Sequence, residues 1–245
     1  MCGRYVHPDS AAIERAWHVG RHNSDPFGAS YNVFPTSSVP ILRLERDTGG
    51  LDRDAGGLEL TRARWGFIPH WWKNAKSPQS TINARSEEAA AKPMWRDAWR
   101  RARCLIPASG WYEWREADRV DPQTGGIKRY KQPYFMRRAD GAPLCFAGLT
   151  AWWQPPEADT GVLSCAILTR AAAGRVAEVH DRMPVVLPDD AHAEWLDPEL
   201  ADAARVADFL ARRAQADFVY APVSTAVNGR TEDSARLLEP VALPA

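Results

Sequence analysis

Short runs of β-branched and aromatic residues recur along the chain, and most of them are bounded by Gly, Pro or Asp. Such runs, ended by turn-forming residues, are typical of β-strands. The pattern predicts strands at residues 2–6, 31–34, 39–45, 58–65, 110–115, 130–137, 144–151, 163–169 and 218–222. The protein is therefore expected to be rich in β-structure.

Helical features are confined to a few segments. Ser86 precedes the run of Glu and Ala at 87–91 as an N-cap would, and Pro93 is suited to open a second helix that runs through Arg100. Apolar residues at helical spacing predict two more helices, at 190–196 and 199–214. Grouped strands with few helices indicate an α+β fold, with a mostly antiparallel sheet or barrel-like core and peripheral helices.

Two charged, glycine-rich segments, 47–57 and 117–128, are predicted to be flexible surface loops. Neither is long enough to separate two domains, and no internal repeat is visible. We therefore expect one domain, from residue 2 to residue 241.

Charge and cysteine usage exclude several classes of protein. Lys plus Arg and Asp plus Glu both number 31 in the 245 residues, so only a local patch could attract DNA, and no membrane partner is expected. The chain has no apolar run of about 18 residues, so neither a membrane span nor a signal peptide is expected. Scattered cysteines without a C-x-x-C pair argue against a zinc module and a disulfide framework. We expect no metal, no cofactor and a reducing cytoplasmic setting.

Cys2 is the first candidate for chemistry. Removal of Met1 would leave this cysteine with a free α-amine beside its thiol. Such an aminothiol can attack an acyl carbon, or its amine can condense with an aldehyde before the thiol closes a thiazolidine ring. The alternative is an ordinary cysteine near a frayed terminus.

Three further clusters hold polar groups at predicted turns or strand ends. Asn83 and Arg85 could face a ligand and an anion, or form a solvated turn. Glu113 lies among tryptophans, where its pKa should rise toward neutrality, unless it is exposed on a half-buried strand. His180 can shuttle protons near neutral pH, although a lone histidine is more often structural.

Aromatic and basic segments supply weaker signals. Gly66 and Pro69 interrupt the strand pattern, so Trp71 and Trp72 should lie in a loop, stacked on a base or buried in the core. The arginines between residues 96 and 103 are more typical of a solvated helix face than of a DNA site.

Six short motifs occur in a characteristic order along the chain. They are Met1-Cys2-Gly3-Arg4, Tyr31-Asn32-Val33-x-Pro35, Trp65-Gly66-x-x-Pro69-x-Trp71, Ile82-Asn83-Ala84-Arg85-x-Glu87, Cys104-Leu105-Ile106-Pro107 leading to Gly110-x-Tyr112-Glu113-Trp114, and His180-Asp181-Arg182-Met183-Pro184. This order resembles the SRAP family, the SOS-response-associated peptidases or abasic-site processing proteins. The resemblance runs from Cys2 to about Val241 and implies the SRAP fold.

The resemblance implies a covalent reaction with damaged DNA. Cys2, freed from Met1, would join the ring-opened aldehyde of an abasic deoxyribose through an imine and then a thiazolidine. Asn83 would hold the reacting centre, Glu113 would act as acid and base, and His180 would assist ring opening and reversal. A peptidase-like activity would be limited to release of the protein's own Met1 or reversal of its own crosslink.

The same resemblance implies a DNA-binding surface and a partner. The partner would be single-stranded DNA with an abasic site, including one at a junction with duplex, and the protein would act as a monomer. The arginines would contact phosphates, while the proline and the tryptophan would pack against bases. The implied DNA contacts are Arg4, Arg85, Arg182, Pro35 and Trp72.

One segment departs from the family pattern, and two rival functions stay open. Val227-Asn228-Gly229-Arg230 follows the family's Val-Asn-Asn pattern only in part, so Asn228 is given no role. A class II glutamine amidotransferase also begins Met-Cys-Gly, but its Arg-Gly-Pro-Asp and Asn-Gly-Glu segments are missing here. The second rival is a non-covalent DNA-binding module in which Cys2 is incidental.

Overall fold

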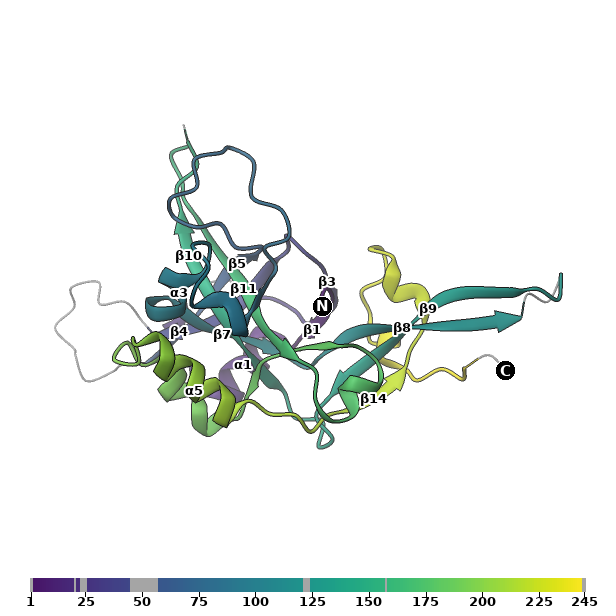
Figure 1. The fold of residues 1–245 in the computed structure, drawn as a ribbon. Helices are drawn as coiled ribbons and strands as arrows, with labels where there is room; N and C mark the ends of the chain where they lie inside the picture. The colour runs from purple at the N-terminus through teal and green to yellow at the C-terminus, as the bar shows by residue number, and fades with distance from the viewer. Residues whose placement is uncertain are drawn as a thin grey trace.

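The computed structural model describes residues 2–19, 21–22, 26–44, 57–120, 124–156 and 158–243. Strands make up most of the regular structure, and helices lie at the periphery (Figure 1). The strands are β1 (Tyr5–His7), β2 (Arg21–His22), β3 (Ser30–Val33), β4 (Ser38–Leu44), β5 (Leu58–Trp65), β6 (Asn83–Arg85), β7 (Arg103–Ala108), β8 (Gly110–Val120), β9 (Ile127–Arg137), β10 (Leu144–Trp153), β11 (Val162–Ala171), β12 (Arg182–Pro184), β13 (Val186–Leu187) and β14 (Val219–Pro222). The helices are α1 (Ser10–Trp17), α2 (Ser86–Ala89), α3 (Arg96–Arg101), α4 (His192–Leu196) and α5 (Ala203–Arg213), with 3-10 turns η1 (Gly174–Glu178), η2 (Asp189–Ala191), η3 (Thr225–Asn228) and η4 (Ala235–Leu238).

The larger sheet closes on itself. Its strands follow the order β11, β10, β7, β4 and β5, and each neighbouring pair is antiparallel. A parallel pairing of Arg64 with Ser164 and of Trp65 with Cys165 then joins β5 back to β11. Closure satisfies the backbone groups that open edges would expose, so this sheet forms a barrel.

The smaller sheet holds the amino-terminal segment in place. Its order is β14, β9, β8, β1 and β3, and all of its pairings are antiparallel. β8 and β9 form a long hairpin whose far end projects from the body (Figure 1). β1 pairs Tyr5 with Trp111 at the body end of β8.

The barrel strands β7, β10 and β11 bury both of their faces along most of their length, which explains their nearly continuous apolar sequences. In β10, Cys145 and Leu149 join one hydrophobic cluster, while Leu144 and Phe146 join another. The first cluster includes residues of α3, α4 and α5, and the second includes Cys2 and Tyr5. The amino-terminal cysteine is therefore part of a packed core.

The expected α+β fold with a mostly antiparallel, barrel-like core is confirmed. The sequence prediction missed α1 and β7. The predicted loop at 117–128 is wrong for residues 117–120 and 127–128, which extend the β8–β9 ladder, with Ala117 opposite Tyr130 and Val120 opposite Ile127. Backbone pairing in a hairpin needs no apolar face, so a charged composition does not prevent it. The predicted loop at 47–57 lies outside the described residues, apart from Gly57.

Helix starts also differ from the prediction, as α2, α3 and α5 show. Pro93 does not open α3, which begins at Arg96 with Trp95 as its N-cap. Ser86 lies within α2 and does not cap it; Arg85 is the N-cap and makes no side-chain cap hydrogen bond. α5 begins later than expected because Asp202 accepts hydrogen bonds from the N–H groups of Ala204 and Arg205.

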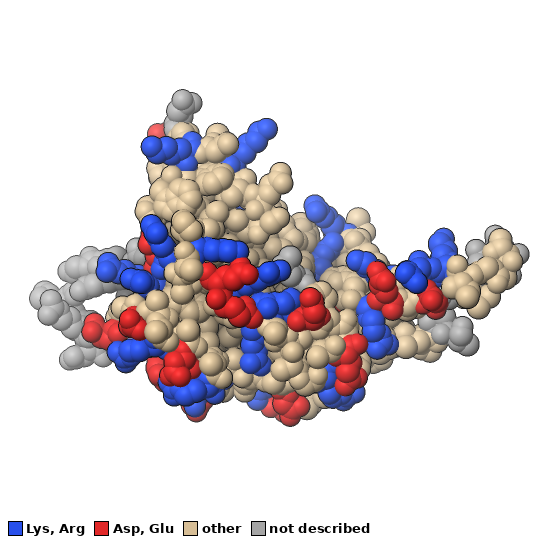
Figure 2. Space-filling model, in the orientation of Figure 1, with Lys and Arg blue, Asp and Glu red and all other residues tan. Residues whose placement is uncertain are grey.

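Acidic and basic side chains are interspersed over the face that Figure 2 shows, in keeping with the zero net charge. In the described ranges, no helix combines the length and the apolar character that a membrane crossing requires.

Candidate active site

Cys2 is buried against the second hydrophobic cluster, so the interpretation as a frayed terminus is wrong. The exposed fraction of Cys2 is 0%. The backbone N–H of Tyr112 donates to the carbonyl of Arg4 at 3.0 Å, which continues the pairing of the amino-terminal segment with β8. Burial, and then the nearby charge of Glu113, raises the pKa of the Cys2 thiol well above its usual value. The thiol is therefore held protonated at neutral pH.

Asn83 fixes the backbone of Cys2. The Nδ2 group of Asn83 donates to the carbonyl oxygen of Cys2 at 2.8 Å. Asn83 lies on β6, which pairs in parallel with β11 through Ile167. Its Oδ1 atom is buried and has no hydrogen-bond partner among the residues described. An acceptor with unused capacity beside a reactive residue is suited to orient a ligand.

Glu113 is an almost fully buried carboxylic acid, with 1% of its residue exposed. It lies on β8 beside Trp114, with buried Tyr134 opposite it on β9. Burial raises the pKa of Glu113 to about 7, and the charge of Asp181 adds to the rise. Glu113 can therefore both give and accept a proton at neutral pH, and the alternative of an exposed glutamate is wrong.

His180 faces Glu113 from the segment that follows η1. Its Nε2 atom lies 3.7 Å from Oε2 of Glu113. Burial lowers the pKa of His180, so the neutral ring is favoured at pH 7. Nδ1 lies 2.9 Å from the N–H of Arg182 and equally close to the carboxylate of Asp181. The two contacts at Nδ1 call for opposite tautomers, because the N–H of Arg182 needs an unprotonated Nδ1 and the carboxylate of Asp181 needs an N–H there.

Glu113 and His180 line an open pocket of about 430 Å³. Trp114, Lys131 and Asn228 form the rest of its wall. The Nε1 group of Trp114 donates to Oδ1 of Asn228 at 2.8 Å, so the amide of Asn228 is fixed. The positive charge of Lys131 also contributes to the lowered pKa of His180.

Arg4 lies next to this pocket and is held by neutral oxygens. Its guanidinium donates to Oδ1 of Asn32 at 2.8 Å and to the carbonyl oxygens of Gly229 and Asn228 at 3.0 and 3.4 Å. Burial, and then the charge of Arg230, lowers its pKa. The arginine is oriented by these contacts without being neutralised by them.

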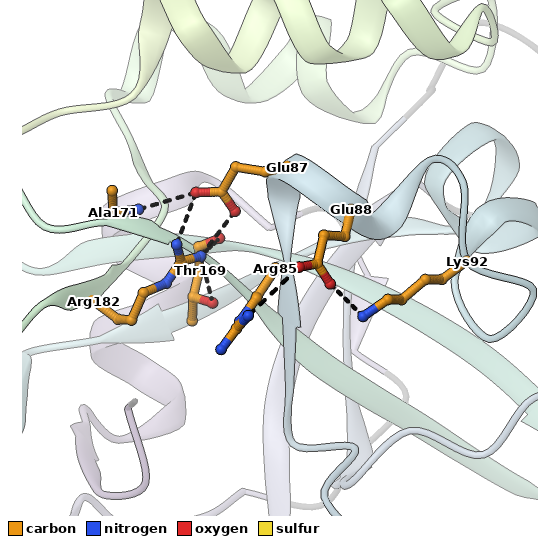
Figure 3. Close-up of polar contacts among 7 residues, drawn as sticks. All are labelled: Arg85, Glu87, Glu88, Lys92, Thr169, Ala171 and Arg182. Carbon is orange, nitrogen blue, oxygen red and sulfur yellow. Dashed lines mark hydrogen bonds and ion pairs between the residues drawn. The ribbon is translucent and has the colours of Figure 1, made fainter.

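Arg182 and Arg85 lie in different electrostatic settings (Figure 3). Arg182 forms a bidentate pair with Glu87, with both N–O distances at 2.8 Å, and donates to the carbonyl of Thr169 at 2.9 Å. Arg85 is exposed and makes only a 3.5 Å contact with Glu88. Arg85 can turn to an external anion at little cost, whereas Arg182 already has a carboxylate partner.

Trp72 and Pro35 lie in loops, as the sequence predicted for Trp72. The Nε1 group of Trp72 donates to the carbonyl of Lys76 at 2.8 Å, and its own carbonyl accepts from Nε1 of Trp153 at 2.7 Å. Trp71 is 43% exposed and lies beside Trp72, with ring centroids 6.1 Å apart. Core burial was expected for at least one of the two tryptophans, and this expectation is wrong, because Trp71 presents an aromatic surface to solvent and Trp72 is only half-buried.

The model of the family described as SOS response associated peptidase (SRAP) matches residues 1–230. The chain belongs to the SRAP family. Its sequence is 36% identical to "Abasic site processing protein YedK" of Escherichia coli, covering 98% of this chain and 100% of that protein. It is 33% identical to "Abasic site processing protein YoqW" of Bacillus subtilis, covering 98% of this chain and 99% of that protein.

A solved structure supports the same fold. A protein of Bordetella bronchiseptica matches with a TM-score of 0.70 and 28% identity, over 91% of this chain and 100% of that one. A vertebrate SRAP relative, "Abasic site processing protein HMCES" of Gallus gallus, is 32% identical over 87% of this chain and 67% of that protein.

The SRAP motifs located the paired acid and base but missed part of the pocket wall. Asn228 was given no role because its segment departs from the family pattern, yet it lines the pocket with Glu113 and His180. Lys131 had no sequence signal, since only the β8–β9 register brings it there. Within the described residues, no three His, Cys, Asp or Glu side chains gather as a metal site requires.

Proposed function

We propose that this SRAP protein processes abasic sites in single-stranded DNA by joining covalently to them through Cys2. The observation that carries the proposal is the convergence of Cys2, Asn83, Glu113 and His180 from four distant segments of the chain. The names of the similar proteins, YedK and YoqW, support abasic sites as the substrate.

The proposed reaction starts once Met1 has been removed. The α-amine of Cys2 adds to the aldehyde carbon of the ring-opened sugar, and loss of one water gives an imine. The thiol sulfur then adds to the imine carbon while its proton passes to nitrogen, which closes a thiazolidine. The adduct therefore contains both reactants less one water.

Each site residue has a role that its environment supports. Glu113, whose pKa burial raises to about 7, relays protons during imine formation and ring closure. His180, whose lowered pKa favours the neutral ring, assists opening of the closed sugar and reversal of the adduct. Asn83 holds the Cys2 backbone and is a positioning residue.

The DNA contacts are part of the same proposal. Arg4 and Arg85 are suited to phosphates because one is held by neutral oxygens and the other is exposed. Pro35 and Trp72 are proposed to pack against bases of a bent strand, including one at a junction with duplex. Arg182 would reach a phosphate only after partial release of Glu87, and its N–H also holds Nδ1 of His180.

The protonated state of the Cys2 thiol disfavours the amidotransferase alternative. That reaction needs a thiolate to attack an amide, whereas burial raises the pKa of this thiol. Imine formation by the amine comes first in the proposed route, so a neutral thiol can wait for the imine.

Intact-mass analysis after incubation with an abasic single strand tests the proposal. We expect the mass of the protein without Met1, plus the DNA, less one water. Cys2→Ala, and an added residue that blocks the α-amine, should abolish the adduct. Protein that has lost Met1 but stays unmodified under these conditions would contradict the proposal.

Variants of the acid and the base separate chemistry from binding. Glu113→Gln and His180→Ala should slow adduct formation or reversal by on the order of 100-fold and change DNA affinity little. Glu116→Gln, farther along the same strand and outside the pocket, is the matched control. Equal losses of rate and affinity would instead indicate structural roles.

A further inference from the structure

A second pocket, of about 280 Å³, lies beside β3 and β5 and is lined by two arginines on aromatic rings. The guanidinium carbon of Arg230 lies 4.8 Å from the ring centroid of Phe34. The guanidinium carbon of Arg62 lies 4.9 Å from the ring centroid of Phe27. A guanidinium seated on a ring is preorganised and keeps its charge.

These two cations lack a carboxylate partner. In the part of the chain that the structure describes, neither Arg62 nor Arg230 has an acidic side chain within ion-pair distance. Arg62 instead donates to the hydroxyl and the carbonyl of Ser38, at 3.1 and 2.7 Å. Both arginines are therefore available to an external anion.

Asp233, the one acid among the described residues that line this pocket, accepts hydrogen bonds from the backbone. Its Oδ1 atom accepts from the N–H groups of Tyr31 and Asn32, the latter at 2.8 Å. The hydroxyl of Ser30 donates to the same carboxylate at 3.1 Å. His7, also in the wall, is buried and has a lowered pKa, so it adds no charge at neutral pH. The pocket is left with a net positive charge.

A hydrogen-bond network joins this pocket to the candidate active site. Asn32, in the wall of the second pocket, accepts from Arg4 at 2.8 Å and donates to the carbonyl of Gly229 at 3.1 Å. Arg4 also donates to the carbonyl of Asn228, which lines the pocket of Glu113 and His180. Arg4 thus lies between the two pockets, and the ring of Phe34 is 5.6 Å from its guanidinium carbon.

We propose that the pocket of Arg62 and Arg230 binds a backbone phosphodiester of the same DNA strand, on one flank of the reacting nucleotide. The inference rests on the proposed function for its choice of ligand. Guanidinium forks match the geometry of phosphate oxygens, and the row of Arg62, Arg230 and Arg4 leads toward the reacting centre.

The first test measures binding of an undamaged single strand at several salt concentrations, by fluorescence anisotropy. The double variant Arg62→Gln/Arg230→Gln should bind several-fold more weakly than the wild type at low salt. The slope of log K against log salt should become shallower by about 0.7 for each phosphate that the variant no longer neutralises. Arg212→Gln, whose guanidinium pairs with Asp208 on α5, is the matched control and should not change the slope.

The second test locates the phosphate with abasic strands that carry one neutral methylphosphonate linkage. One linkage near the lesion should weaken binding to the wild type, and the double variant should be insensitive at that linkage. Arg62→Lys/Arg230→Lys should restore part of the salt slope, because charge returns without the planar fork.

The outcomes separate this inference from the proposed chemistry. An unchanged salt slope and an unchanged linkage profile in the double variant, with normal adduct formation, would overturn the inference alone. A shallower slope without any adduct in the wild type would support the subsite and contradict the covalent reaction. Saturation by submillimolar inorganic phosphate, abolished in the double variant and without effect on strand binding, would overturn assignment of the pocket to DNA.

Discussion

At the scale of single residues, burial is the main cause of the shifted pKa values of Glu113 and His180. It raises the pKa of Glu113 to about 7 and lowers the pKa of His180. The neutral form is favoured in both groups, so their titration ranges move toward each other. A proton can then pass between them, or through a ligand that lies between them, without a large energy difference.

The raised pKa of Glu113 predicts how stability depends on pH. The folded state binds the proton of Glu113 more tightly than the unfolded state does. The contribution of this proton to the free energy of unfolding is therefore fully present below a pH of about 4.5. That contribution is lost as the pH rises through about 7. Between about pH 4 and about pH 8, the unfolding free energy of the wild type should fall by about 3 kcal/mol relative to Glu113→Gln.

Urea unfolding of both proteins at the two pH values measures this difference. Glu199→Gln, at an exposed position, is the control and should follow the wild type. Parallel pH profiles for the wild type and Glu113→Gln would contradict the raised pKa.

At the scale of elements, the Arg182–Glu87 pair joins α2 to β12 beside the site (Figure 3). The carboxylate of Glu87 also accepts from the N–H of Ala171, at the end of β11, at 3.1 Å. The carboxylate of Glu87 thus connects α2, β11 and β12. In the sequence, α2 follows directly after β6, the strand that carries Asn83. The pair helps to hold His180 too, because the N–H of Arg182 donates to its Nδ1 atom.

Glu87→Gln should lower stability at neutral pH. Burial opposes ionisation of Glu87, but hydrogen bonds from Arg182 and Ala171 outweigh it, so its pKa is lowered. A lowered pKa stabilises the fold above the unfolded-state pKa, and this stabilisation disappears as the pH falls through the folded-state value. Glu87 is half exposed, so the expected loss at neutral pH is about 1 kcal/mol.

Thermal or urea unfolding at neutral and acidic pH measures the effect. Glu88→Gln, one residue further and in an exposed pair with Lys92, should have a smaller effect. If the free energy of unfolding of Glu87→Gln is lower than that of the wild type by the same amount at acidic pH, packing and not charge holds these elements together.

At the scale of the whole molecule, three strands of the smaller sheet, β1, β8 and β9, lie side by side near Gly110. This residue begins β8 and pairs with Val6 of β1. A Cβ atom here would collide with the carbonyl oxygen of Met136 and the ring of Phe135, both on β9. The pairing of β1 with β8 at this point places the amino-terminal segment beside the strand that carries Glu113.

Gly110→Ala should therefore destabilise the protein by about 2 kcal/mol or more, because backbone atoms must move to relieve the collision. Gly28→Ala is the matched control, since a Cβ there meets no atom within 4 Å. Urea unfolding measures the free energy of unfolding of both variants. Equal stability of the two variants would contradict tight packing at Gly110.

Much of the fold and of the site was predictable from the sequence. The alternation of apolar residues and turn formers located most barrel strands, and short-range context placed Glu113 in an apolar strand. The missed strand β7 is a short run that contains Pro107, a residue that weakens the prediction of a strand. The hairpin beyond Ala117 was missed because its charged residues gain order only from pairing with the other strand.

The sequence by itself determined the α+β class, the order of the SRAP motifs and the identity of Cys2, Asn83, Glu113 and His180 as candidates. Only the tertiary structure decided that Cys2 is buried, that Arg182 is paired with Glu87, and that Asn228 and Arg230 line two pockets joined through Arg4. The reason is physical. Residue type and spacing set local preferences, but burial and charge pairing depend on which distant segments the barrel and the smaller sheet bring together.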